Sequence, residues 1–196
     1  MSLISSNIGL KEWAVTSGSL GRGEQIFLLR KGGIREDGRH FKIEHEQFLL
    51  YPGLFHEGQL LLKQENQHLL QETVNADFSN EITFSVYCEL VETIEISEEH
   101  QVRALDAFHI WSEDFTVKRF NWKPRPSLKL RIVRAYKLDT PTTVRVTDEY
   151  GGCKSWVDLD NEIDISASTP ALTDAEFEKQ ISQIHIALTS ETVTAH

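Results

Sequence analysis

The stretch EITFSVYCELVETIEI (residues 81–96) decides the fold of this chain. Apolar side chains alternate with polar ones from Ile82 to Leu90, and the alternation resumes at Ile94 and Ile96. A period of two places one set of side chains on a buried face and the other on a solvent face, as in a half-buried strand. The sequence therefore predicts one long strand here.

Further strands are expected on both sides of this one. Residues 127–138 alternate in the same way, and residues 142–146 form a β-branched run after Pro141. Two shorter apolar runs, residues 25–30 and 48–51, each end at a glycine-containing turn. Strands thus make up most of the predicted core.

Helices are predicted between and after the strands. Apolar residues at helical spacing predict a first helix over residues 7–20, and residues 58–72 have the composition of an amphipathic helix. One or two helices are expected within residues 98–120, and Thr173 with Glu176 forms a capping box for a last helix. The fold class is α+β, with a bent mixed or antiparallel sheet, or a partly closed and PUA-like barrel, flanked by helices.

We expect one α+β domain over residues 1–190, followed by a frayed tail at 191–196. Cys88 and Cys153 lie far apart and belong to no metal-type pair, so we expect no disulfide, no metal and no cofactor. The sequence has no signal-type N-terminus and no apolar run of membrane-spanning length. These features predict a cytoplasmic protein that does not associate with membranes.

The formal net charge is −10, which opposes binding of polyanions by the molecule as a whole. Local charge is very uneven. Residues 89–114 hold eight acidic side chains, whereas residues 118–137 hold eight basic side chains and no acidic one. An anionic ligand is therefore expected at the second segment, and a basic partner protein at the first.

The basic segment interleaves cations with aromatic rings, a combination that suits phosphates and unstacked bases. Its candidate nucleic-acid contacts are Lys118, Arg119, Trp122, Lys123, Arg125, Arg131 and Arg134. A second group of candidate anion ligands surrounds a glycine turn that can expose backbone N–H groups, namely Arg30, Lys31, Gly32, Gly33 and Arg35. The alternatives are that the rings pack into the core and that the turn is an ordinary solvated hairpin.

A third group of residues is titratable. The candidates for acid, base or nucleophile are His45, His56, Glu44 and Cys153, close in sequence to glycine turns. The histidines match no metal-binding helix pattern, and packed or exposed histidines are the alternative. Whether the chain is an enzyme stays open at this point.

Four segments of the sequence carry a resemblance to a known family. They are LKEWAV (10–15), GEQIFLLRKGGI (23–34), FLLYP (48–52) with His56, and GGCKSW (151–156). Together they resemble an uncharacterised bacterial family, domain of unknown function 1802. The family tends to have Tyr-Pro-Thr-Tyr-Glu-His where this chain has YPGLFH (51–56). The resemblance spans nearly the whole chain and implies no assigned reaction.

Three functions follow as hypotheses. The first is a module that binds RNA or single-stranded nucleic acid through the two cationic groups. The second is a hydrolase or nucleotide-processing enzyme with a His/Glu site beside the Gly32-Gly33 turn. The third is an interaction domain whose acidic segment binds a basic protein partner.

Overall fold

The computed structural model describes residues 4–31, 45–53, 61–73, 78–122, 127–152 and 154–190. Its centre is a seven-stranded mixed sheet. The strand order is β2 (Phe27–Arg30), β5 (Leu128–Arg145), β4 (Glu81–Ile96), β3 (Gln47–Gly53), β1 (Ser5–Trp13) and β6 (Trp156–Asp164), and β7 (Ser168–Pro170) pairs with β5. Within the described residues β2 and β6 end this order without pairing to each other, so the sheet is open. The α+β prediction with a bent, helix-flanked sheet is confirmed.

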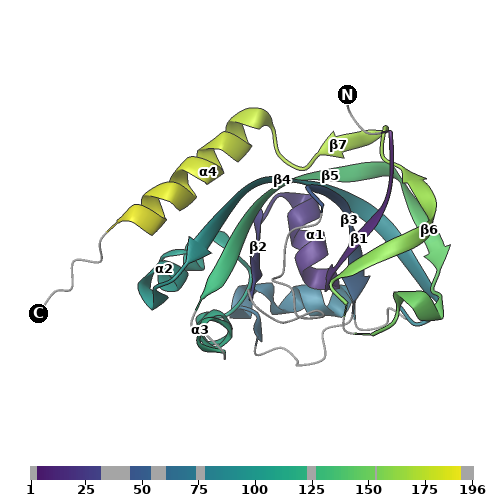
Figure 1. Cartoon of the computed structure of the whole chain (residues 1–196). Helices are drawn as coiled ribbons and strands as arrows, with labels where there is room; N and C mark the ends of the chain where they lie inside the picture. Colours follow the sequence, from purple (N-terminus) through teal and green to yellow (C-terminus); the bar gives the residue numbers. More distant parts are fainter. Residues whose placement is uncertain are drawn as a thin grey trace, which may run out of the picture.

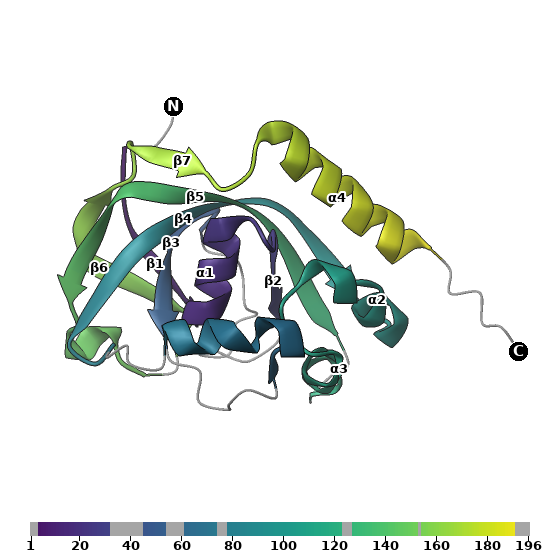
Figure 2. The same cartoon turned by 180° about the vertical axis from the view of Figure 1, so that it is seen from behind.

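The predicted long strand is β4 (Glu81–Ile96), and it pairs along its whole length with β5 (Leu128–Arg145). The register shifts near Ser85 and again near Val91, and such bulges bend and twist a ladder. Figures 1 and 2 show the result, in which β4 and β5 arch over α1 (Ala14–Arg22). β2 (Phe27–Arg30) lies on one side of α1, and β3 (Gln47–Gly53) and β1 lie on the other.

The predicted helix over residues 7–20 is wrong in its first half. Residues 5–13 form strand β1 (Ser5–Trp13), which pairs in parallel with β3 and antiparallel with β6 (Trp156–Asp164). Sheet pairing overrides the helical spacing here, because β1 lies between two strands and forms a ladder with each of them. α1 then begins at Ala14 and ends at Arg22, and the next residue, Gly23, has a φ of 72°, the left-handed conformation typical of a helix C-terminus.

Two faces of the bent sheet bury two sets of alternating side chains. Leu28 of β2 and Val133 of β5 pack toward Leu20 of α1. Their sequence neighbours Phe27 and Ile132 point the opposite way, into a core shared with the other helices. Those helices are α2 (Glu99–Ala104), η3 (Asp106–Phe108), α3 (Glu113–Asn121) and α4 (Asp174–Thr189).

Several elements differ from their predicted form. The helix expected over residues 58–72 is a 3-10 helix, η2 (Gln64–Glu72), within the described residues. β5 continues through Pro141 instead of ending before it. β6, β7 (Ser168–Pro170) and the short η4 (Asp148–Tyr150) were not predicted, whereas the capping box of Thr173 and Glu176 starts α4 as expected. No helix in the described ranges has the length and apolar character needed to cross a bilayer.

Candidate anion-binding site

Three segments that are distant in sequence meet at the C-terminal end of β2. Arg30, the last residue of β2, donates from Nη2 to the Lys11 carbonyl oxygen at 2.6 Å and pairs with Glu12 Oε2 at 3.0 Å. Both charged side chains of the pair are mostly buried. The sheet order separates β2 from β1 by three strands, so Arg30 joins two strands that the ladder itself keeps apart.

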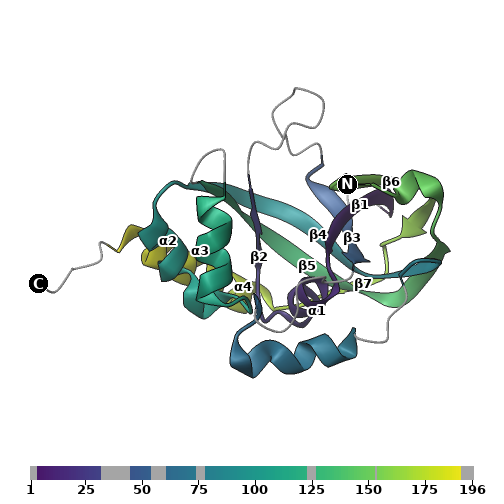
Figure 3. The same cartoon turned by 90° about the horizontal axis from the view of Figure 1, so that it is seen from below.

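The third segment is the end of α3, which lies beside β2 in Figure 3. Lys31 donates from Nζ to the Phe120 carbonyl oxygen at 2.7 Å. Burial lowers the pKa of Lys31, and the positive charge of Arg119 lowers it further. This contact brings a cation of the glycine-turn group next to a cation of the basic segment.

Arg119 lies between aromatic rings and a carboxylate. Its guanidinium is 5.8 Å from the ring centroid of Trp13 and 5.7 Å from that of Phe115. Burial lowers the pKa of Arg119, the negative charge of Glu12 opposes this, and the charge of Arg30 adds to it. Among the described residues, the buried Nε–H of Arg119 has no hydrogen-bond acceptor, and neither has the Nε–H of Arg30. Two guanidinium groups thus share Glu12 and keep unused donors.

A fourth cation completes the cluster. Arg131 of β5 is only 2 % exposed, and burial together with the charge of Arg30 lowers its pKa to about 10. We name Arg30, Lys31, Arg119 and Arg131, with Glu12, the cationic cluster. Like charges placed so closely repel one another, and a bound anion would relieve that repulsion.

A small cavity adjoins the cluster. It has a volume of about 10 Å³, enough for one water-sized group, and is lined by Glu12, Trp13, Leu29, Trp111, Phe115 and Arg119. Trp111 is 3 % exposed, and its Nε1–H has no acceptor in the part of the chain that the structure describes. The cavity is therefore walled by aromatic rings and by two residues with unused N–H donors.

The outer rim of the site lies on α3. Lys118 is exposed, and Trp122, directly after the helix, is 70 % exposed. Phe120 is 3 % exposed and belongs to the core. The two rings of the predicted basic-aromatic segment thus differ, since one packs inward and one is available to a ligand.

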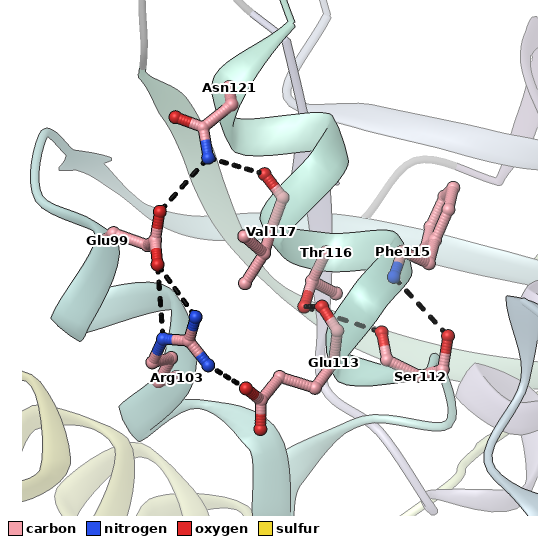
Figure 4. Close-up of polar contacts among 8 residues, drawn as sticks. All are labelled: Glu99, Arg103, Ser112, Glu113, Phe115, Thr116, Val117 and Asn121. Atoms are coloured by element: carbon pink, nitrogen blue, oxygen red, sulfur yellow. Dashed lines mark hydrogen bonds and ion pairs between the residues drawn. The ribbon is translucent and has the colours of Figure 1, made fainter.

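A polar network holds α3 in place, as Figure 4 shows. Glu99 of α2 accepts from Asn121 Nδ2 at 3.0 Å and from Arg103 Nη2 at 2.8 Å, and Arg103 also pairs with Glu113. At the other end of the helix, Ser112 Oγ accepts from the Phe115 N–H at 3.4 Å. Both ends of α3 are thereby anchored.

Arg134, another predicted contact, is engaged elsewhere. It is 8 % exposed, donates to Asp174 Oδ1 at 2.7 Å and to the Leu172 carbonyl at 2.9 Å, and its guanidinium lies over the Phe177 ring, 4.6 Å from the centroid. These contacts tie β5 to α4. We leave Arg134 out of the candidate site.

His45, from the titratable group, lines a second and larger cavity. This cavity has a volume of about 850 Å³ and is lined by Ser5, Ser6, Asn7, Ile8, His45, Glu46, Gln47, Glu89, Leu90 and Glu162. Gln47 Nε2, Tyr87 Oη and Tyr136 Oη each donate to the Glu89 carboxylate at 3.1 Å. Among the described residues, three carboxylates and no Lys or Arg line this cavity, so the field of these residues repels anions. No three His, Cys, Asp or Glu side chains of the described ranges are grouped to hold a metal ion.

Several predicted residues lie outside the described residues: Gly32, Gly33, Arg35, Glu44, His56, Lys123, Arg125, Cys153 and the tail at 191–196. Conversely, the sequence reasoning missed Glu12, Trp13, Trp111 and Phe115 as parts of a site. The segment LKEWAV (10–15) carried a signal for Glu12 and Trp13, because it is one of the family-like segments.

Comparison with known proteins gives a family but no activity. The sequence model of the family described as "Domain of unknown function (DUF1802)" matches residues 9–183. No curated protein matches the chain. A solved structure with some likeness is that of a mutant form of the ZmASCH protein from Zymomonas mobilis, at 11 % identity and a TM-score of 0.36. The likeness covers 89 % of this chain and 94 % of that chain.

Proposed function

We propose that this chain, which belongs to the DUF1802 family, binds RNA or another single-stranded nucleic acid at the cationic cluster and its α3 rim. One observation carries the proposal. Arg30 and Lys31 of the glycine-turn group meet Arg119 of the basic segment, through the 2.7 Å contact of Lys31 with Phe120. An exposed indole, Trp122, follows in the same segment.

The residue types suit the two parts of a nucleotide. Guanidinium groups bind phosphate oxygens through charge-assisted hydrogen bonds. A flat exposed ring such as Trp122 offers a stacking surface to an unpaired base, worth roughly 1–3 kcal/mol per base. A base inside a duplex is already stacked, which is why the exposed ring favours a single strand.

The remainder of the protein limits the size of the interface. Because the net charge is −10, a strand extending far beyond the cluster meets an unfavourable field. We therefore expect few phosphate contacts and a shallow dependence of affinity on salt. With about three contacts, the slope of log K against log salt is about −2 for a single strand.

Fluorescence anisotropy with a labelled 12-nucleotide RNA, measured against salt, tests the proposal. Lys118→Glu and Trp122→Ala change two exposed side chains of the rim and should each weaken binding at least fivefold. Lys179→Glu is the matched control, since Lys179 is an exposed cation on α4. Affinity that ignores salt, or that falls equally for Lys118→Glu and Lys179→Glu, would refute the proposed interface.

A further inference from the structure

Building on the proposed function, we infer that the cationic cluster recognises the end of a strand, by binding a terminal phosphate monoester rather than an internal phosphodiester. Three features of the described residues point to it: the unpaired Nε–H of Arg119, the narrow cavity and the charge of the cluster.

The first feature is the Arg119 guanidinium, which lies close to two aromatic rings. Trp13 and Phe115 both lie within 6 Å of it, and their ring centroids are 5.3 Å apart. All N–H donors of a guanidinium lie in its plane, so it makes its hydrogen bonds through its edge. The Nε–H of Arg119 lies on that edge, and no described residue accepts from it. The site thus holds a planar donor that has no acceptor among the described residues.

The shape of the adjoining cavity is the second feature. Its volume of about 10 Å³ accommodates a single oxygen-sized group, and Leu29 and Trp111, both buried, form part of its wall. A phosphodiester has chain on both sides and needs an open groove, whereas a monoester presents three terminal oxygens that can enter a narrow opening end-on. The unused Nε1–H of the buried Trp111 adds a neutral donor in that wall.

Charge is the third feature. Arg30 and Arg119 share the single carboxylate of Glu12, and the charge of Arg119 also acts on Lys31. A phosphate monoester carries about −1.5 to −2 charges at pH 7, against −1 for a diester. The more highly charged group relieves more of the repulsion inside the cluster, so a terminal phosphate gains more than an internal one.

The test compares four 12-nucleotide RNAs of one sequence, carrying phosphate or hydroxyl at the 5′ end or at the 3′ end, as unlabelled competitors in the anisotropy assay. We expect phosphate at one of the two ends to strengthen binding at least tenfold. A phosphate advantage below twofold at both ends overturns the inference and leaves the proposed function standing. If none of the four RNAs competes, the proposed function itself is overturned.

Two variants locate the effect. Arg119→Lys keeps a positive charge but removes the planar donor edge, and Trp111→Phe removes one N–H while keeping an aromatic ring. Each should reduce the phosphate advantage at least fivefold, whereas the control Lys179→Gln should retain it. Circular dichroism establishes which variants fold, and an undiminished phosphate advantage in a folded Arg119→Lys or Trp111→Phe variant refutes the assigned site.

Discussion

His109 makes the stability of this protein depend on pH. It is 5 % exposed, and its ring centroid lies 6.1 Å from that of Phe27 and 5.3 Å from that of Trp111. Burial lowers the pKa of His109 from 6.5 to about 4, and the positive charge of Lys63 adds to this while Asp106 opposes it. The folded protein therefore keeps this imidazole neutral where an unfolded chain protonates it.

The sign and size of the effect follow from that difference. The folded-state pKa is depressed, so between pH 6.5 and about 4 the unfolded chain binds a proton that the folded chain does not. Stability from this group is complete above pH 6.5 and decreases as the pH falls through that window. At about 1.4 kcal/mol per pKa unit, the full loss is roughly 3 kcal/mol, and roughly 2 kcal/mol of it falls between pH 6.5 and 5. A loss of this size is a large part of the stability of an ordinary domain.

Urea denaturation at pH 7 and pH 5 measures this contribution. His109→Phe removes the titrating group and keeps an aromatic ring between Phe27 and Trp111, so the variant should lose roughly 2 kcal/mol less than the wild type between the two pH values. His185→Gln is the control, because His185 is exposed on α4 and pairs with Glu92 at 2.8 Å. If the wild type and His109→Phe show the same change in unfolding free energy, the assigned neutrality of His109 is refuted.

Two further predictions concern the arch. Arg30→Ala leaves the mostly buried Glu12 without its ion-pair partner and should cost about 3 kcal/mol in urea denaturation, and a double-mutant cycle with Glu12→Gln that gives no coupling would contradict this. Gly23→Ala would place a Cβ atom 2.6 Å from Leu172 Cδ2 at a φ of 72°, whereas Gly152→Ala, at a φ of 78°, meets nothing within 4 Å. Gly23→Ala should therefore lower the thermal midpoint clearly more than Gly152→Ala, and equal shifts would show that the Leu172 contact does not matter.

Local sequence patterns predicted the long strands because each keeps a period of two over many residues. Patterning failed where pairing at long range decides the conformation, as in β1, whose helical spacing gives way to ladders with β3 and β6. Pro141 also misled the prediction. It lies where the register jumps from the Val86–Lys137 pair to the Phe84–Thr142 pair, so its missing N–H costs no ladder bond with β4 and the strand continues.

The candidate site was predicted only in part, again because long-range contacts decide where the side chains lie. The cations of residues 118–134 were recognised by type, but their exposure depends on the element that carries them. On α3, Lys118 is exposed and Arg119 turns toward Trp13. On β5, the packing of α4 buries Arg134, which accordingly binds Asp174 instead of a ligand. Net charge along a segment thus overstates the charge that a ligand meets.

Glu12 could not have been placed by any local rule, because its position depends on the curvature of the whole sheet. In a flat sheet with this strand order, β5, β4 and β3 separate β1 from β2 by far more than a side chain spans, since neighbouring strands lie about 4.8 Å apart. The bulges near Ser85 and Val91 bend the long ladder until Arg30 reaches Glu12 at 3.0 Å. The same bend sets Arg30 and Arg119 around one carboxylate, so the cationic cluster exists only in the arched sheet. Loss of the Arg30–Glu12 pair should therefore weaken both the fold and the binding of a terminal phosphate.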